Sequence, residues 1–175
     1  MELQRLADAL SDAGLVTDPT AEDTFVHGRT YLPGADAEVN LNVDPELDEH
    51  PDAEVGALVE RAAGVLAITA AQWRGVVEQV ASEIEDAVGD EPVAERTDLR
   101  DDLVIRSVVV FADTVLLSFE AAEQFPGGAI RVQLDDDLQV EDLEVDGAAA
   151  VLRDETETVV FDDLDDLLDH LTAET

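Results

Sequence analysis

Four apolar segments between residues 103 and 145 follow one another with only short polar turns between them. They read LVIRSVVVF, VLLSFEA, AIRVQL and LQVEDLEV, and begin at Leu103, Val115, Ala129 and Leu138. The first is rich in β-branched residues, and the third alternates apolar with polar side chains, as half-buried strands do. Short connections between consecutive strands are typical of hairpins. The four segments therefore predict a largely antiparallel sheet.

A further hairpin is predicted nearer the start of the chain. Residues 25–32 and 37–43 have strand character, and the turn sequence LPGAD lies between them. In the second segment Val39, Leu41 and Val43 alternate with polar residues, so one face of this hairpin should contact water. Residues 148–153, AAAVLR, either extend the sheet or lead out of it.

Apolar residues at three- and four-residue steps predict four helices. They cover residues 2–13, 53–66, about 70–88 and 161–171, with Gly14 and Gly89 as ends of the first and third. Thr69 and Gln72 form a capping-box pattern before the third helix. Asp residues crowd the first turns of the last one, where the helix dipole favours anions.

The order of elements predicts an α+β fold, with a largely antiparallel sheet built from hairpins and packed against two central helices. N- and C-terminal helices flank this core. The length suits a single domain over residues 1–175. Its parts are an N-terminal helix and connector (1–20), the hairpin, helix pair and sheet (21–153) and a C-terminal helix (154–175).

Acidic residues dominate the charge of the chain. Asp and Glu number 44 against nine basic residues, all arginine, giving a net charge of −35. Such a surface repels nucleic acid and anionic lipid. Adaptation to molar salt, where charge repulsion is screened, is the favoured explanation, and GC-rich coding is the alternative. A third reading is a DNA mimic that blocks a basic protein.

The sequence also indicates several absences. It contains no cysteine, which excludes a disulfide framework and thiolate chemistry. Its first residues carry acids and no long apolar run, unlike a signal peptide, and no stretch reaches the length of a membrane span. We therefore expect a cytoplasmic protein with no membrane partner.

The acidic run at residues 135–147 resembles a calcium-binding loop only superficially. Counting from Asp135, Asp137 fits a ligand position, but Gln139 is a poor ligand and Val140 stands where the loop requires glycine. Asp is also common in tight turns. A solvated hairpin turn is therefore the expected structure.

No catalytic, cofactor-binding or metal-binding residues are predicted. His27, His50 and His170 lack a second histidine at ligand spacing. No nucleophile elbow surrounds any serine, and without lysine no phosphate-binding P-loop is possible. Trp73 opens the best apolar helix, so core packing is its expected role and ligand stacking the minority one. The expected positions are a helix end, a helix surface and two strands for Ser11, Ser82, Ser107 and Ser118.

Residues 25–147 resemble a group of small, uncharacterised bacterial proteins with an F-W-G-H-like motif before an acidic turn. Phe125 and Gly127 match that motif, whereas Pro126 and Gly128 replace its tryptophan and histidine. Some such proteins have been proposed as immunity proteins, so the resemblance implies binding rather than catalysis. Any activity of the family's histidine would be missing here.

Together these features predict a non-enzymatic protein without a cofactor that acts by binding another protein, in an immunity-like or regulatory role. A basic protein is the expected partner, because opposite charge speeds association. The alternatives are a small-molecule binding module or cryptic enzyme, with a pocket between the sheet and the Trp73 helix, and the DNA mimic. The sequence leaves the oligomeric state open.

Overall fold

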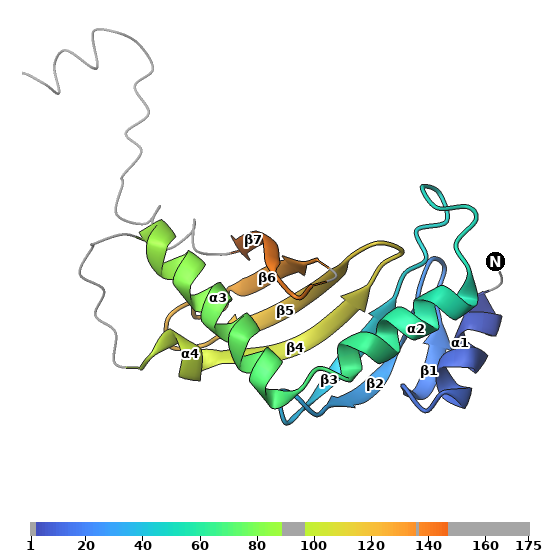
Figure 1. Ribbon diagram of the computed structural model, residues 1–175, viewed down its shortest axis with the longest axis horizontal. Helices are drawn as coiled ribbons and strands as arrows, with labels where there is room; N and C mark the ends of the chain where they lie inside the picture. The colour runs from blue at the N-terminus through green and yellow to red at the C-terminus, as the bar shows by residue number, and fades with distance from the viewer. Residues whose placement is uncertain (1–2, 89–96, 136, 147–175) are drawn as a thin grey trace, which may run out of the picture.

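The computed structural model describes residues 3–88, 97–135 and 137–146, which form one seven-stranded sheet with helices (Figure 1). Its strands lie side by side in their order along the chain, from β1 to β7. Their bounds are β1 Thr17–Ala21, β2 Val26–Leu32, β3 Ala37–Val43, β4 Leu103–Val110, β5 Val115–Ala121, β6 Ala129–Leu134 and β7 Val140–Asp146. The α+β class and the mostly antiparallel sheet are thus confirmed.

One pair of neighbouring strands breaks the antiparallel pattern. Strands β3 and β4 run parallel, with Leu41 opposite Val108 and Val43 opposite Val110. A parallel pair needs a long crossover, and the chain supplies it as helices α2, α3 and α4 between the two strands. The sheet is therefore a three-stranded and a four-stranded antiparallel unit joined in parallel at the centre.

The helices follow the apolar periodicity of the sequence. Their bounds are α1 Leu3–Asp12, α2 Val55–Leu66, α3 Ala70–Val88 and α4 Leu99–Asp102. The predicted capping box is confirmed: the Thr69 backbone N–H donates to Gln72 Oε1 at 3.0 Å, and the Gln72 N–H donates to Thr69 Oγ1 at 3.3 Å. Gly14 follows α1 with a positive φ of 68°. It is the expected helix end.

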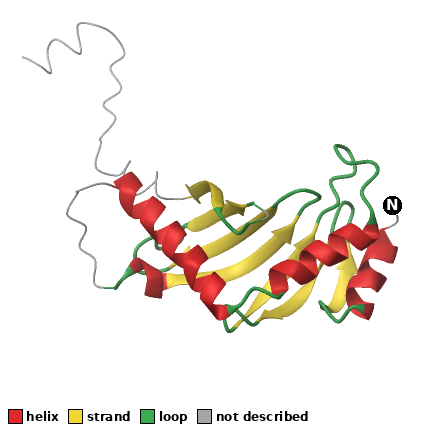
Figure 2. Ribbon diagram, viewed as in Figure 1, coloured by secondary structure: helices red, strands yellow, loops and turns green. Residues whose placement is uncertain are grey.

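Helices α1, α2 and α3 lie over the same face of the sheet (Figures 1 and 2). In β5 every second residue faces the helices, and Val115, Leu117 and Phe119 on that face are buried. Trp73 of α3 is only 9% exposed and stacks on Phe119 with 5.7 Å between the ring centroids. Its expected role in core packing is confirmed.

Two elements were not expected from the sequence. The sequence predicts a connector after the first helix, but residues 17–21 form edge strand β1, which tolerates Pro19 because an edge strand needs fewer ladder N–H donors. The short helix α4 precedes β4, and Asp98 caps it by accepting the Arg100 N–H at 2.9 Å. The expected C-terminal helix, Gly89 and residues 148–153 lie outside the described residues.

Candidate functional site

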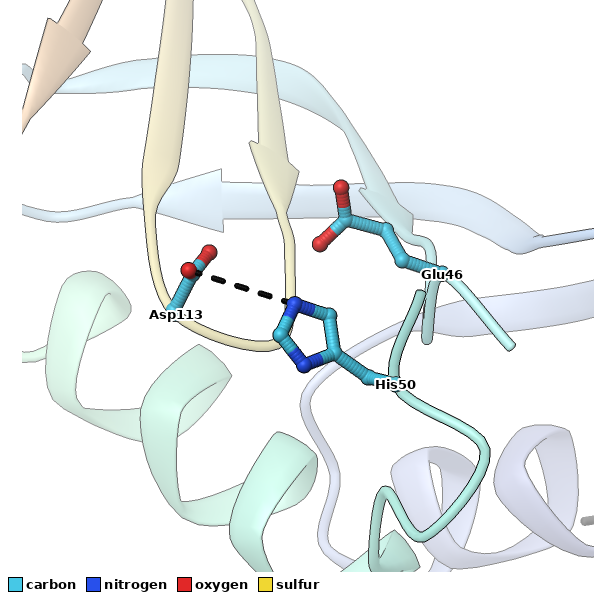
Figure 3. A group of neighbouring side chains, drawn as sticks. All are labelled: Glu46, His50 and Asp113. Carbon is cyan, nitrogen blue, oxygen red and sulfur yellow. Dashed lines mark ion pairs between the residues drawn. The ribbon is translucent and has the colours of Figure 1, made fainter. Parts of the chain in front are cut away.

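Three side chains that could bind a cation converge at one end of the sheet. Glu46 and His50 belong to the loop between β3 and α2, whereas Asp113 belongs to the turn between β4 and β5 (Figure 3). One ligand atom from each lies within 4.8 Å of the others, and His50 Nε2 is 3.9 Å from Asp113 Oδ2. The parallel pairing of β3 with β4 brings these two distant segments together.

The backbone of the β3–α2 loop fixes the direction of Glu46. Its φ is 48°, and its N–H donates to the Asp44 carboxylate at 2.9 Å. Its carbonyl accepts the His50 N–H at 2.7 Å, and its carboxylate accepts the Ala112 N–H at 3.3 Å. The loop therefore holds Glu46 against the turn that carries Asp113.

A hollow of about 400 Å³ opens beside this cluster. Its acidic lining residues are Glu49, Asp52 and Glu54, and its apolar ones come from the loop, the start of α2 and the β4–β5 turn. The lining residues are Glu49, His50, Pro51, Asp52, Ala53, Glu54, Ala57, Leu58 and Ala112. Six of the eleven residues at 44–54 are acidic. We call the hollow lined by these nine residues the acidic hollow.

The cluster and the acidic hollow beside it both suit positively charged ligands. In the cluster, one imidazole nitrogen and two carboxylate oxygens are ligands that several divalent transition metals accept. In the hollow, a guanidinium or ammonium group could pair with the acidic residues while its alkyl stem contacts the apolar lining. Arg61 of α2 donates to the Asp113 carbonyl at 3.1 Å and so braces the turn.

Sequence reasoning missed this cluster because it compared histidines only with other histidines. Glu46 precedes His50 by four residues, a spacing that pairs side chains within one turn, and this signal was available. The approach of Asp113 could not be predicted from local spacing, because it depends on which strands pair. His27 lies on β2, away from this cluster, and its Nε2 is 3.4 Å from Glu22 Oε1. His170 lies outside the described residues.

The acidic run after β6 forms the expected hairpin turn. The Asp135 carboxylate accepts the N–H groups of Asp137 and Gln139, both at 2.8 Å, and Leu138 has a φ of 61°. Strands β6 and β7 flank this turn and pair antiparallel. The carboxylate that a calcium loop would use as its first ligand instead holds the turn itself.

The FPGG motif immediately precedes β6. Gly127 has a φ of 76°, and a Cβ on Gly128 would lie 2.7 Å from the Asp146 carbonyl oxygen. No side chain fits position 128 in this backbone. The histidine of the F-W-G-H-like motif therefore has no place here, which counts against carrying that family's features to this chain.

Of the serines considered in the sequence, two are neighbours on the sheet. Ser107 of β4 pairs with Ser118 of β5, whereas Ser11 lies near the end of α1 and Ser82 within α3. The two described histidines contact carboxylates, Glu22 and Asp113, rather than hydroxyl groups. A serine–histidine pair is thus not formed among the described residues.

A second polar network ties α3 and α4 together. Arg100 donates to Glu78 through Nε and Nη2 at 2.7 and 2.8 Å, and to Glu85 through Nη1 at 2.6 Å. These hydrogen bonds hold the pKa of the Arg100 guanidinium above its ordinary value and the pKa of Glu78 below its own. Buried Asp102 accepts the N–H groups of Glu123 and Gln124, each at 3.0 Å. These contacts hold elements of the fold in place and are not part of the candidate site.

Comparison with protein-family models, curated proteins and solved structures gave no match for this chain. Its proposed role therefore depends on its own residues. Among the described helices, none alone is long and apolar enough to cross a membrane; α2 and α3 together would suffice by length and composition, but they meet at an 86° bend.

Proposed function

We propose that this protein is a non-enzymatic binding protein, with an immunity-like or regulatory role, that receives a basic segment of another protein in its acidic hollow. The observation that carries the proposal is that three acidic residues, Glu49, Asp52 and Glu54, line the same hollow as a set of apolar residues. A partner's arginine or lysine matches both parts. The overall charge of −35 would speed its approach.

Calorimetric titration with an arginine-containing peptide tests this proposal, with a peptide carrying citrulline instead as the neutral comparison. We expect the double variant E49Q/D52N to bind about fivefold more weakly than wild type, since each exposed ion pair contributes about 0.2–1 kcal/mol. The matched control is E83Q/D86N on α3, which removes the same charge away from the hollow. Equal weakening in both double variants would show diffuse attraction and refute the proposed site.

A second candidate function is divalent-cation binding by Glu46, His50 and Asp113, the small-ligand alternative that the structure favours. In this case the ligand would bind beside the β3–α2 loop rather than between the sheet and Trp73, which packs in the core. Titration with Co²⁺ in molar KCl should then give absorption bands typical of nitrogen coordination. The variant H50Q should abolish them, and E49Q should not.

A DNA mimic would also bind a basic protein, so the titration alone does not separate it from the first proposal. Its partner would be a nucleic-acid-binding protein, and duplex DNA would compete for the same surface of that partner. An immunity-like or regulatory contact centred on the hollow predicts no such competition.

A further inference from the structure

The face of the sheet opposite the helices carries two rows of side chains that run across all seven strands. Strand pairing places the members of each row side by side. The first row is Thr17, Arg29, Asn40, Ser107, Ser118, Arg131 and Glu144, and the second is Thr20, His27, Asn42, Val109, Leu116, Gln133 and Asp142. The twelve members on β1 to β6 form what we term the acid-free band.

The acid-free band departs from the composition of the chain. At the overall frequency of 44 acidic residues in 175, twelve positions would hold about three, and the band holds none. Strand position does not explain this, because β7 presents Asp142, Glu144 and Asp146 on the same face. The absence of carboxylates is specific to the middle of the open face.

Desolvation supplies a reason for such a band. A carboxylate that loses its hydration without gaining partners costs free energy, so the centres of protein interfaces are depleted of charge. Hydroxyl and amide groups, which dominate the band, are less costly to cover. At its centre Val109 pairs with Leu116, and both side chains are half-buried. The band therefore has the composition of a surface that another protein covers.

We propose that the acid-free band is the interface of a symmetric dimer, in which the open faces of two copies of this chain pack together. The distribution of charge across the face supports a second copy as the occupant. Arg29 lies on β2 and forms no ion pair among the described residues, whereas β6 and β7 together present three carboxylates to one arginine. One end of the face thus offers an arginine without an ion pair among the described residues, and the other end carries an excess of carboxylates.

A two-fold axis parallel to the strands, between β4 and β5, makes these ends complementary. It places β2 of one copy over β7 of the other, β3 over β6 and β4 over β5. This rotation leaves the position of each residue along the strand direction unchanged. Each row of one copy therefore faces the same row of the other copy. Arg29 then faces Glu144 of the second copy, and His27 faces Asp142. Val109 faces Leu116 at the axis.

The size of the overlapping face suits a weak dimer. The six overlapping strands β2 to β7, about 4.8 Å apart with residues about 3.3 Å apart, give roughly 24 by 20 Å, or about 480 Å² per copy. Two copies would bury about 1,000 Å², the size of weak or transient interfaces. The charge of −35 on each copy opposes association in dilute buffer, and salt screens that repulsion. The dimer should therefore strengthen with salt.

Sedimentation velocity of the full chain in molar KCl tests the dimer directly. We expect twice the monomer mass of 18.8 kDa for wild type and at least a tenfold weaker dimer for S107E, which adds a carboxylate between Asn40 and Ser118. The matched control A71E adds the same charge at an exposed position of α3 and should remain dimeric. Circular dichroism in the same buffer checks the fold of each variant.

A charge exchange keeps the test decisive if S107E fails to fold. R29E, at an exposed position, should dissociate the dimer. The double variant R29E/E144R should restore it, because each exchanged charge faces an opposite charge of the other copy across the axis. A monomeric wild type in molar KCl, or an R29E/E144R variant no more dimeric than R29E, would overturn the proposal. Either result leaves peptide binding at the acidic hollow unaffected.

Discussion

At the scale of single residues, Arg100 joins α3 to α4 through three carboxylates. Hydrogen bonds from the Arg100 backbone and side chain hold the pKa of Asp98 below its ordinary 3.8, and bonds from the guanidinium hold the pKa of Glu78 below its ordinary 4.5. A carboxyl group with a lowered folded-state pKa stabilises the fold above its unfolded pKa. That contribution is lost as the pH falls through the folded value.

We predict that R100Q lowers the melting temperature at neutral pH, because Glu78 and Glu85 lose their shared donor. The difference from wild type should shrink as the pH falls below about 4, where the carboxyl groups become protonated in both proteins. Thermal melts followed by circular dichroism across this pH range provide the measurement. R74Q is the control, since Arg74 of α3 donates, among the described residues, to the Ala70 carbonyl alone. A difference independent of pH would contradict this assignment.

Residue patterns predicted local contacts well and distant contacts poorly. The Thr69–Gln72 capping box and the Asp135 turn follow from side chains that reach backbone groups within four residues. The approach of His50 to Asp113 spans 63 positions and depends on sheet order. Only the Glu46–His50 spacing carried a local signal for the candidate site.

At the scale of elements, the β2–β3 turn packs against the junction of α2 and α3. A Cβ on Gly34 would lie 2.6 Å from the Ile68 carbonyl oxygen, whereas a Cβ on Gly75 of α3 would meet nothing within 4 Å. The two glycines therefore have opposite roles. Gly34 permits close approach of backbone, and Gly75 only lowers the helix propensity.

We predict that G34A destabilises the fold by about 1–3 kcal/mol through overpacking. In contrast, G75A should stabilise it by up to about 1 kcal/mol, because alanine is the better helix former. Urea unfolding at a constant KCl concentration measures both free energies of unfolding. If G34A were as stable as wild type, the turn would not rest on the helix junction as the structure places it.

Element types were predictable wherever the hydrophobic period was clear, as in α3 and in β3 to β6. The edge strand β1 was not, because Asp18 and Pro19 both disfavour strands, and pairing with β2 and packing against α1 stabilise it. The parallel pairing of β3 with β4 was also missed. Nothing in either strand specifies its neighbour, since the crossover through α2 and α3 decides it.

At the scale of the whole molecule, the charge of −35 should make stability depend on salt. Screening reduces repulsion among carboxylates, so we predict that the melting temperature rises from dilute buffer to molar KCl. Circular dichroism melts over that range provide the measurement. A melting temperature that stays constant would favour GC-rich coding over adaptation to salt as the origin of the acidity.

The division of the surface into an acidic hollow and an acid-free band is the central feature of this molecule. Chemical-shift mapping of the ¹⁵N-labelled protein with the arginine-containing peptide, at fixed KCl concentration, locates cation binding directly. We predict perturbed amides at residues 44–58 and 112–113, around the hollow, with little change on the open face of the sheet. Perturbations spread evenly over the acidic positions of α3 and the loops would contradict a specific site.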